Sequence, residues 1–279
     1  MPELPEVETI RRQLAESLAG SVVTDAWAFG SAKFTPALDT VGSRLVSVRR
    51  RGKYLVIDLS DARTPSDSAP ERELIVHLGM TGRLGLDDLP TQRRHLRARW
   101  WLDDERTLSF DDTRRFGRIA VVPMGDHRSL PTLAAMGPEP FDEGFSPERL
   151  RQMVNRSTTA LKTQLLSQRI VAGVGNIYAD EALWRARVHP ASRRITVAAA
   201  GRLRDSVRDV LEEGIEHGGT TLRDYRDATG GEGDHQNHLD CYGRAELPCR
   251  RCGEPLRRSV IDARSTVHCT VCQVRGGGS

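Results

Sequence analysis

Residues 249–272 read CRRCGEPLRRSVIDARSTVHCTVC, and the cysteines of this stretch carry the most specific signal in the chain. Two Cys-x2-Cys pairs stand 16 residues apart, which is typical of a tetrahedral zinc site that takes two thiolates from each pair. Because four thiolates leave no open coordination position, one structural Zn2+ is expected here and no catalytic metal. The four expected ligands are Cys249, Cys252, Cys269 and Cys272.

The residues between the two cysteine pairs are expected to form a short β-hairpin. The stretch PLRRSVIDARSTVH (255–268) suits two short strands, and its tip would present Arg264. Structural disulfides are rare in the cytosol, which favours metal binding for the paired cysteines. The fifth cysteine, Cys241, falls outside the spacing and is expected to be a buried free thiol.

The composition describes a globular chain that is neither disordered nor embedded in a membrane. Of the 279 residues, 38% are hydrophobic and 28% are charged, with a mean hydropathy of −0.46, and this length suits two domains. No apolar run approaches the roughly 18 residues of a membrane span, and the N-terminus is acidic where a secretory signal needs an apolar core. The expected location is therefore the cytoplasm.

The charge of the chain does not by itself identify a partner, because 41 Lys and Arg stand against 38 Asp and Glu. The basic residues nevertheless occur in clusters, such as VRRRGKY, QRRHLRARW and TRRFGR. If folding brings these clusters to one side, they form a surface suited to nucleic-acid phosphates. Taken singly, each cluster is better explained as a solvated face.

Two kinds of periodicity divide the chain and predict an α+β fold. From about residue 21 to 122, runs such as YLVIDLS and GRIAVVP alternate with turns, which predicts an antiparallel β-sandwich or barrel. After MGPEPFDEGF (136–145), the expected linker, the period becomes helical. Helices are expected after Ser146 and through 159–168, 176–187 and 196–217.

The first residues, MPELPEVETI, place a proline directly behind Met1 and two glutamates close to it. From Leu4 onward, apolar residues three or four apart predict an amphipathic helix. Proline suits a first helical position, and acidic residues suit the positive end of the helix dipole. A helix start therefore explains Pro2, Glu3 and Glu6 when they are considered alone.

Six motifs spread along the chain together resemble the bacterial formamidopyrimidine-DNA glycosylase family. They are MPELPEVET, HLGMTGRL (77–84), DDTRRFG (111–117), QRIVAGVGNIYADEALW (168–184), GGTTLRDY (218–225) and the cysteine module with its Arg-Ser-Thr. The resemblance covers essentially the whole chain, in order. It implies a β-sandwich with a catalytic N-terminal helix, a helical domain with a helix–two-turn–helix, and a zinc-finger hairpin. It also implies excision of oxidised purines, such as 8-oxoguanine and formamidopyrimidines, followed by β,δ-elimination at the abasic site.

By this resemblance, the initiator methionine is removed and Pro2 becomes the nucleophile. An α-amino group titrates near ~8, against ~10.4 for a lysine, so it offers more free amine at neutral pH for a Schiff base. Glu3 would be the general acid/base and Glu6 a supporting carboxylate, with a helix-dipole partner as the alternative for Glu6. Lys53, on an expected strand, would contact the phosphate near the lesion and assist catalysis, and Arg264 would clamp the flanking phosphates as part of the catalytic set.

The resemblance also implies which residues hold the DNA. A base must leave the duplex to be cut, and Met80, Arg114 and Phe116 would fill the space that it leaves. Asn176 would bind phosphate at the glycine-rich turn VAGVGN, where backbone N–H groups can approach an anion closely. Weaker candidates for DNA binding, with packing or an ordinary surface position as the alternative, are His77, Lys162 and Tyr178.

The loop TTLRDYRDATGGEGDHQNHLD (220–240) would cover the extruded purine. Its candidate residues are Thr220, Thr221 and Tyr225. The loop departs from the family where Asp234 and His235 precede Gln236, because many relatives carry an aromatic residue there. This departure leaves the preferred lesion open.

The expected domains are a catalytic β-sandwich (1–135), a helical DNA-binding domain (146–240), a zinc finger (241–275) and a flexible tail (276–279). The expected partner is double-stranded DNA containing oxidised bases, bound by a monomer. Two other functions stay open. One is an endonuclease VIII-like glycosylase for oxidised pyrimidines; the other is a zinc-finger DNA-binding protein without catalysis, against which the presence of Pro2 argues.

Overall fold

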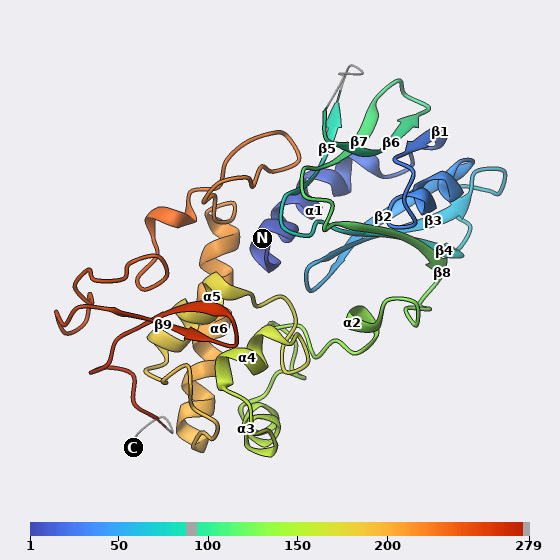
Figure 1. Cartoon of the computed structure of the whole chain (residues 1–279). Helices are drawn as coiled ribbons and strands as arrows, with labels where there is room; N and C mark the ends of the chain where they lie inside the picture. Colours follow the sequence, from blue (N-terminus) through green and yellow to red (C-terminus); the bar gives the residue numbers. More distant parts are fainter. Residues whose placement is uncertain (88–93, 276–279) are drawn as a thin grey trace. The chain divides into compact units, whose positions relative to one another are not determined.

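The computed structural model describes residues 1–87 and 94–275, so the expected tail lies outside the described residues. The chain divides into two compact units (Figure 1). Unit 1 comprises Met1–Ala134 and His217–Asp234, and unit 2 comprises Ala135–Glu216 and the residues from His235 onward. The fold class is α+β, as the sequence predicts.

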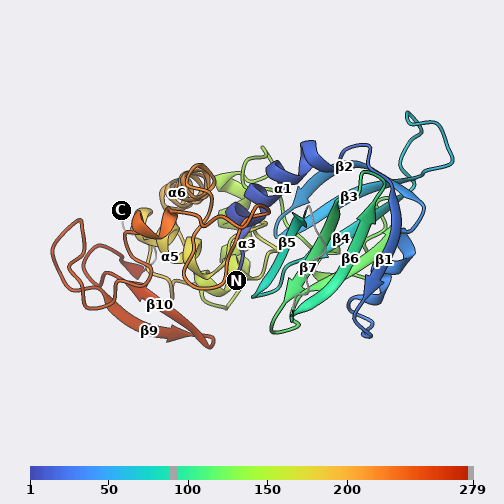
Figure 2. The same cartoon turned by 90° about the horizontal axis from the view of Figure 1, so that it is seen from above.

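Unit 1 is a β-sandwich of two four-stranded antiparallel sheets, whose stacking can be followed in Figure 2. The strand order is β2-β3-β4-β8 in one sheet and β1-β6-β7-β5 in the other. The first sheet consists of β2 (Ser43–Arg51), β3 (Tyr54–Asp61), β4 (Arg72–His77) and β8 (Arg118–Pro123). The second consists of β1 (Val23–Ala28), β6 (Leu96–Leu102), β7 (Thr107–Asp112) and β5 (Gly82–Asp87). Side chains from both sheets fill one apolar core, which confirms the predicted sandwich.

Strands β1 and β5 do not stand out in the sequence. β5 reads GRLGLD, and its two glycines suggest a turn when only local sequence is considered. The structure requires Gly85, because a Cβ there would lie 2.4 Å from the carbonyl oxygen of Ala228. In β1, Val23 alone is fully buried, so the alternation of apolar and polar residues is weak.

Helix α1 (Leu4–Leu18) packs on strands of both sheets through the apolar face that the sequence predicts. The buried residues of that face include Val7, Ile10, Leu14 and Leu18. The N-cap of α1 is Glu3, and the proline in its first turn is Pro5. The alternative explanation of Pro2 as a first helical residue is therefore wrong. Pro2 precedes the cap, so helix formation does not explain it.

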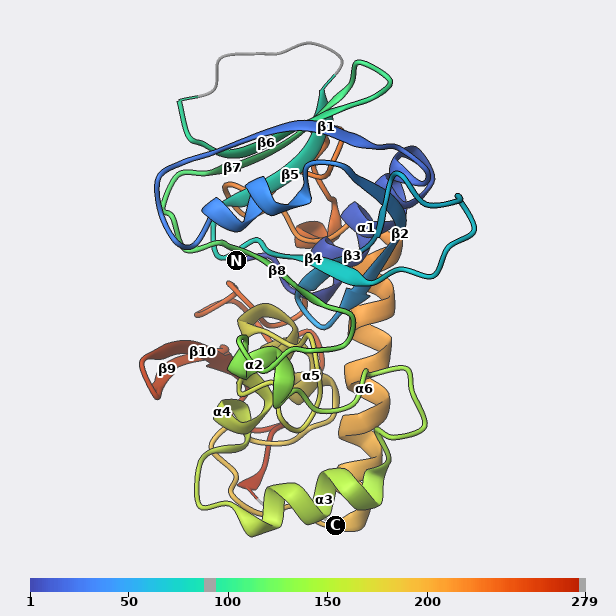
Figure 3. The same ribbon diagram turned by 90° about the vertical axis from the view of Figure 1, so that its right-hand side faces the viewer.

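The helices of unit 2 follow the predicted order (Figure 3). They are α3 (Pro147–Arg156), α4 (Leu161–Leu166), α5 (Asn176–Arg185) and α6 (Val197–Glu216). Ser146 caps α3 as expected, because its side chain accepts a hydrogen bond from the N–H of Arg149. Gln168 holds the glycine-rich turn before α5: its side chain donates to Val174 O at 2.7 Å and accepts from the N–H of Gly173 at 2.8 Å.

The hairpin expected between the cysteine pairs consists of β9 (Arg257–Ile261) and β10 (Arg264–His268). The two turn residues, Asp262 and Ala263, have φ values of 45° and 61°, as a two-residue I′ hairpin turn requires. Arg264 is thus the first residue after the turn and is exposed. β10 packs against α5.

Shorter elements complete the described secondary structure. They are the 3-10 helices Thr35–Thr40 and His235–Asn237 and the one-turn helix α2 (Pro131–Ala134). Within residues 1–87 and 94–275, no helix combines the length and the apolar content needed to cross a bilayer.

The segment His217–Asp234 follows α6 in the chain but packs in unit 1. Tyr225 and Ala228 of this segment lie in the core of the sandwich. Most of the expected lesion loop therefore belongs to the unit that contains the N-terminus.

Candidate active site and nucleic-acid interface

The N-terminal turn of unit 1 is built around two buried glutamates. Glu3 is 2% exposed and Glu6 is 1% exposed. The N–H of Glu3 donates to Oε2 of Glu6 at 2.7 Å, and the two side chains form a reciprocal capping box at the start of α1. Pro2 is buried directly before this turn, whereas Met1 is 52% exposed. The capping box thus fixes the backbone next to Pro2.

The second oxygen of Glu6 holds the segment that begins the expected lesion loop. Oε1 of Glu6 accepts a hydrogen bond from the N–H of Thr220 at 2.7 Å. Gly219 allows this approach, because a Cβ there would lie 2.8 Å from Cγ of Glu6 and its φ is +88°. One carboxylate therefore joins the N-terminal turn to residues more than two hundred positions later in the chain.

The other candidate residues of the lesion loop make hydrogen bonds within the segment 217–234. Tyr225 is 7% exposed, and its hydroxyl donates to Gly218 O at 3.1 Å. Burial, and then the charge of Glu6, raise the pKa of Tyr225, so the hydroxyl stays a neutral donor. The hydroxyl of Thr221 accepts from the N–H of Gly233 at 2.9 Å.

Lys53 and His77 lie close together near one end of the first sheet. Lys53 is 6% exposed and lies in the turn between β2 and β3, not on a strand as expected. Burial, and then the charge of Lys53, lower the pKa of His77 from 6.5 to about 4, so the imidazole is neutral at pH 7. Because Nδ1 of His77 accepts from the N–H of Gly79 at 3.3 Å, the proton of the neutral ring is on Nε2.

The three expected intercalating residues lie on two loops that touch each other. Met80 is 39% exposed and Phe116 is 50% exposed, so both apolar side chains are accessible to a ligand. The guanidinium carbon of Arg114 lies 4.7 Å from the centroid of the Phe116 ring. A Cβ on Gly79 would be 2.5 Å from the backbone N of Gly117, so the two loops meet backbone to backbone.

Buried Asp112 fixes the shape of these two loops. Its carboxylate accepts from the hydroxyl of Thr81 at 2.6 Å and from the N–H of Gly117 at 2.7 Å. It also accepts from the N–H of Arg114 at 3.2 Å. The exposed side chains are thus carried on backbone that the fully buried side chain of Asp112 holds in place.

Two cavities of unit 1 adjoin the loops and contain many basic residues. The lining of the first, about 240 Å3 in volume, includes Lys33, His77, Phe116 and Arg118. The lining of the second, about 590 Å3, includes Arg83, Arg94, Arg223 and Arg226. Within unit 1, folding thus gathers basic residues that the sequence has far apart.

In unit 2, a buried ion pair holds the hairpin on helix α5. Nζ of Lys162 lies 2.6 Å from Oδ1 of Asp180, and both side chains are 0% exposed. Lys162 also donates to Ser265 O at 2.9 Å and to the hydroxyl of Thr266 at 3.0 Å. The other carboxylate oxygen of Asp180 accepts from the N–H of Val267 at 2.9 Å. Burial raises the pKa of Asp180 to about 7 despite the attraction of Lys162.

Three expected DNA-binding residues of unit 2 differ in their exposure. Lys162 and Tyr178 are fully buried, and the ring of Tyr178 stacks on His235 with centroids 5.5 Å apart. The packing alternative therefore describes both residues. Asn176, at the first position of α5, is partly exposed and donates to Ser265 O at 3.2 Å. Arg264, one residue before Ser265, is exposed at the hairpin turn.

Sequence reasoning missed the acidic residues that position these elements. Asp180 and Glu181 lie in α5 among apolar neighbours that are all buried. Glu181 accepts backbone hydrogen bonds from the three residues that lead into the cysteine module: Asp240, Cys241 and Tyr242. Two adjacent acids inside an otherwise apolar helix were the available signal, because buried carboxylates need hydrogen-bond partners.

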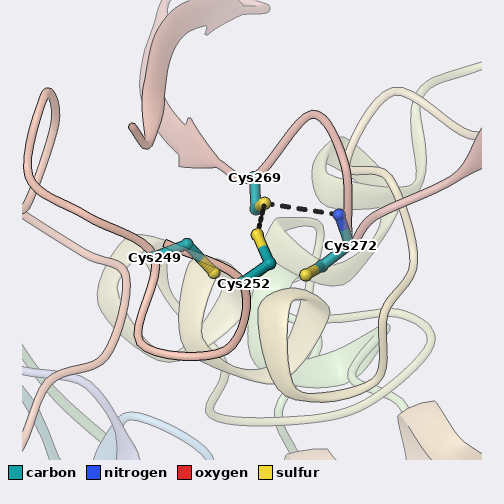
Figure 4. Close-up of side chains that lie close together, drawn as sticks. All are labelled: Cys249, Cys252, Cys269 and Cys272. Atoms are coloured by element: carbon teal, nitrogen blue, oxygen red, sulfur yellow. Dashed lines mark hydrogen bonds between the residues drawn. The ribbon is translucent and has the colours of Figure 1, made fainter. Parts of the chain in front are cut away.

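The four paired cysteines converge at the base of the hairpin (Figure 4). Their sulfur atoms all lie within 4.8 Å of one another, and the Sγ atoms of Cys252 and Cys269 are 3.5 Å apart. Burial raises the pKa of Cys249, but hydrogen bonds from backbone N–H groups and from the Trp184 indole, 3.4 Å away, outweigh it and lower the pKa to about 6. Four convergent thiols of this kind fit a tetrahedral metal site.

Cys241 is separate from this cluster. It is fully buried, and its thiol donates to Val267 O at 3.1 Å. Burial raises the pKa of Cys241, which makes it an inert thiol.

Comparison with known proteins decides the family. The model of the formamidopyrimidine-DNA glycosylase N-terminal domain matches residues 1–119, and the model of the family's H2TH domain matches residues 136–226. The chain belongs to the formamidopyrimidine-DNA glycosylase family. Relatives of that name include the Deinococcus radiodurans protein, which is 42% identical with 98% of this chain and 97% of the relative covered. The Thermus thermophilus protein is also 42% identical, with 99% and 100% covered.

Solved structures of the family have the same fold. The crystal structure of the MutM (Fpg) protein from Thermus thermophilus is 43% identical and superimposes with a TM-score of 0.88, covering 99% of this chain and all of the other. Lactococcus lactis Fpg in complex with an N7-benzyl-Fapy-dG-containing DNA is 32% identical, with a TM-score of 0.86, and covers 98% of this chain and 99% of the other. The same Lactococcus protein has also been crystallised with DNA containing an abasic site.

Proposed function

We propose that this protein is a bifunctional DNA glycosylase and abasic-site lyase that removes oxidised purines, namely 8-oxoguanine and formamidopyrimidines, from duplex DNA. The observation that carries the proposal is the double use of Glu6. Its carboxylate binds the N–H of Glu3 beside Pro2 and the N–H of Thr220 at the start of the lesion loop. The candidate nucleophile and the candidate base-recognition loop therefore share one support.

Pro2 is proposed as the nucleophile once Met1 has been removed. A secondary α-amine near its ordinary pKa of ~8 is about a tenth unprotonated at pH 7. Its nitrogen would bond to C1′ of the sugar as the bond from C1′ to the base breaks, and opening of the sugar ring would then give an iminium ion. Loss of a proton from C2′ breaks the C3′–O bond, and a second elimination breaks the C5′–O bond.

Glu3 is proposed to move the protons of these steps, because its carboxyl group lies next to the reacting nitrogen in sequence and at the cap of α1. Glu6 is proposed as a positioning residue, since its two oxygens already bind backbone N–H groups. Lys53 and neutral His77 would bind phosphate oxygens through Nζ and Nε2–H.

The duplex is proposed to be opened by Met80, Arg114 and Phe116. Their exposure and the rigid backbone beneath them suit insertion into the stack. Arg114 would bond to the base left unpaired, with Phe116 wedged beside it.

In unit 2, Asn176 and Arg264 are proposed to bind the phosphates that flank the extruded nucleotide. The four-cysteine cluster is proposed to hold one structural Zn2+ that stabilises the hairpin and takes no part in the reaction. Buried Lys162 and Tyr178 would act through packing.

The proposed organisation keeps the expected domains, 1–135, 146–240 and 241–275, with DNA bound by a monomer in the cytoplasm. Residues 217–234, though part of the helical domain in sequence, would serve the catalytic domain into which they pack.

The test is a competition between defined lesions. Duplexes with 8-oxoguanine, a formamidopyrimidine or thymine glycol, each with its own fluorescent label, are mixed and the released bases and strand products are resolved. We expect the two purine lesions to be cut first, with the double-elimination product. Preference for thymine glycol would favour the endonuclease VIII-like function instead, and binding without any cleavage would favour the non-catalytic DNA-binding protein.

A further inference from the structure

Gln13 of α1 holds the lesion loop at a second point, two helical turns beyond Glu6. Its side-chain NH2 donates to Oδ2 of Asp227 at 2.9 Å, and its Oε1 accepts from the N–H of Ala228, also at 2.9 Å. Residues seven apart lie on one face of a helix, about 10 Å from each other along the axis. Glu6 and Gln13 thus fasten the loop to the same face of α1.

Between the contacts with Glu6 and Gln13, the loop contains both buried and exposed residues. Thr220, Tyr225 and Ala228 are 4%, 7% and 4% exposed. In contrast, Leu222 is 50% exposed, and Arg223 and Asp224 beside it are also exposed. Leu222 is thus an exposed apolar side chain on a loop that is held at both ends, and it is available for contact with a ligand.

Asp227, the partner of Gln13, also holds the backbone of the residues that follow it. Oδ1 of Asp227 accepts from the N–H groups of Thr229 at 2.9 Å and Gly231 at 2.7 Å, while Oδ2 faces Gln13. Burial acts to raise the pKa of Asp227, but the bonds from Gln13 and Thr229 outweigh it and lower the pKa below its usual range. The amide of Gln13 therefore complements an ionised carboxylate and a backbone N–H at once.

We infer that Gln13 is a positioning residue for recognition of the damaged base. Gln13 fixes the exposed residues 222–224 in the position where they would contact an extruded base. Glu6 fixes the start of the loop and the catalytic turn. This inference rests on the proposed function.

Excision and abasic-site cleavage should depend differently on the Gln13 contact. Excision of a damaged base needs the loop to hold that base, whereas cleavage at a preformed abasic site offers the loop no base to hold. Loss of Gln13 should therefore impair excision more than abasic-site cleavage.

The first experiment compares Gln13→Ala with wild type on 8-oxoguanine duplex and on abasic-site duplex, under single-turnover conditions. We expect the excision rate to fall about 10- to 100-fold, the scale of a misplaced reacting group, and abasic-site cleavage to change much less. The matched control is Gln152→Ala, an exposed glutamine of helix α3. Equal loss of both reactions, or unchanged excision, would overturn the inference.

A second experiment exchanges donor and acceptor across the contact. Gln13→Glu brings two carboxylates together, and Asp227→Asn brings two NH2 groups together, so each single variant should lose excision selectively. In the double variant, the amide of the new asparagine can donate to the new glutamate, and excision should recover relative to both single variants. Additive losses in the double variant would contradict a direct positioning contact.

These results remain distinguishable from failure of the proposed function. If wild type neither excises nor cleaves, the proposed function is wrong. If wild type does both and the Gln13 variants match it on 8-oxoguanine, only the inference about Gln13 is wrong.

Discussion

The two units support their candidate residues in different ways. In unit 1, the side chains proposed for catalysis and intercalation lie on turns and loops at the edge of a sandwich with its own large core. In unit 2, Arg264 lies at the tip of a two-stranded hairpin, and a hairpin of that size is at best marginally stable alone. The buried charges of α5 hold the hairpin, and the metal proposed for the cysteine cluster at its base would hold it further.

The difference indicates that the units should respond to different perturbations. Removing a metal or one buried charge should release the hairpin and leave the sandwich folded. Changing the protonation of a group inside the sandwich should act on unit 1.

The largest effect is expected from the cysteine cluster. Cys269→Ser, or removal of the proposed metal with a chelator, should unfold the hairpin, because metal binding supplies folding free energy directly in small metal-bound modules. Binding of abasic-site duplex should then be lost in a fluorescence anisotropy titration. Hydrogen exchange should show fast exchange in residues 257–268 and continued protection in β2, β3 and β4. The matched control is Cys241→Ser, where the hydroxyl can still donate to Val267 O. If the hairpin amides stay protected without metal, the metal site is not what supports the hairpin.

The next effect is expected from the buried ion pair. In urea unfolding above pH 8, where Asp180 is ionised, Asp180→Asn keeps an acceptor for the N–H of Val267 but leaves the charge of Lys162 uncompensated. It should therefore destabilise unit 2 by about 3–5 kcal/mol. The control is Glu213→Gln, which removes one partner of the half-exposed pair with Arg185 and should cost about 1 kcal/mol or less. Similar costs for the two variants would show that the Lys162 pair is not a principal support.

A smaller effect, confined to unit 1, is expected from pH. The pKa of His77 is lowered to about 4 in the folded chain, so between pH 6.5 and 4 the unfolded chain binds the proton more readily. The free energy of unfolding of unit 1 should therefore fall as the pH is lowered through this window, by about 1–3 kcal/mol in all. His77→Gln should flatten this part of the stability curve. An unchanged slope in the variant would assign the acid sensitivity to other groups.

Local sequence was sufficient for features that depend on neighbours in the chain. The cysteine spacing predicted the cluster and the hairpin, and the periodicity of residues 4–18 predicted α1, because ligand spacing and helical faces are properties of short stretches. The mixed fold and the sandwich followed from the same kind of signal.

Features that depend on distant residues could not be predicted in this way. β5 contains Gly85 because Ala228 lies against it, and the Gln13–Asp227 contact joins residues 214 positions apart. The interior position of Lys162 depends on Asp180 and on the hairpin strand. Of these partners, only Asp180 carries a local signal, as one of two adjacent acids in an otherwise apolar stretch.

The central claim, that the N-terminal proline is the nucleophile, is tested most directly by trapping. The protein with Met1 removed is incubated with abasic-site duplex and borohydride, and the reduced adduct is digested and mapped by mass spectrometry. A form that retains Met1 serves as the control. We expect the adduct on the peptide that begins with Pro2 and none with the blocked form; an adduct on Lys53, or equal trapping of the blocked form, would contradict the account.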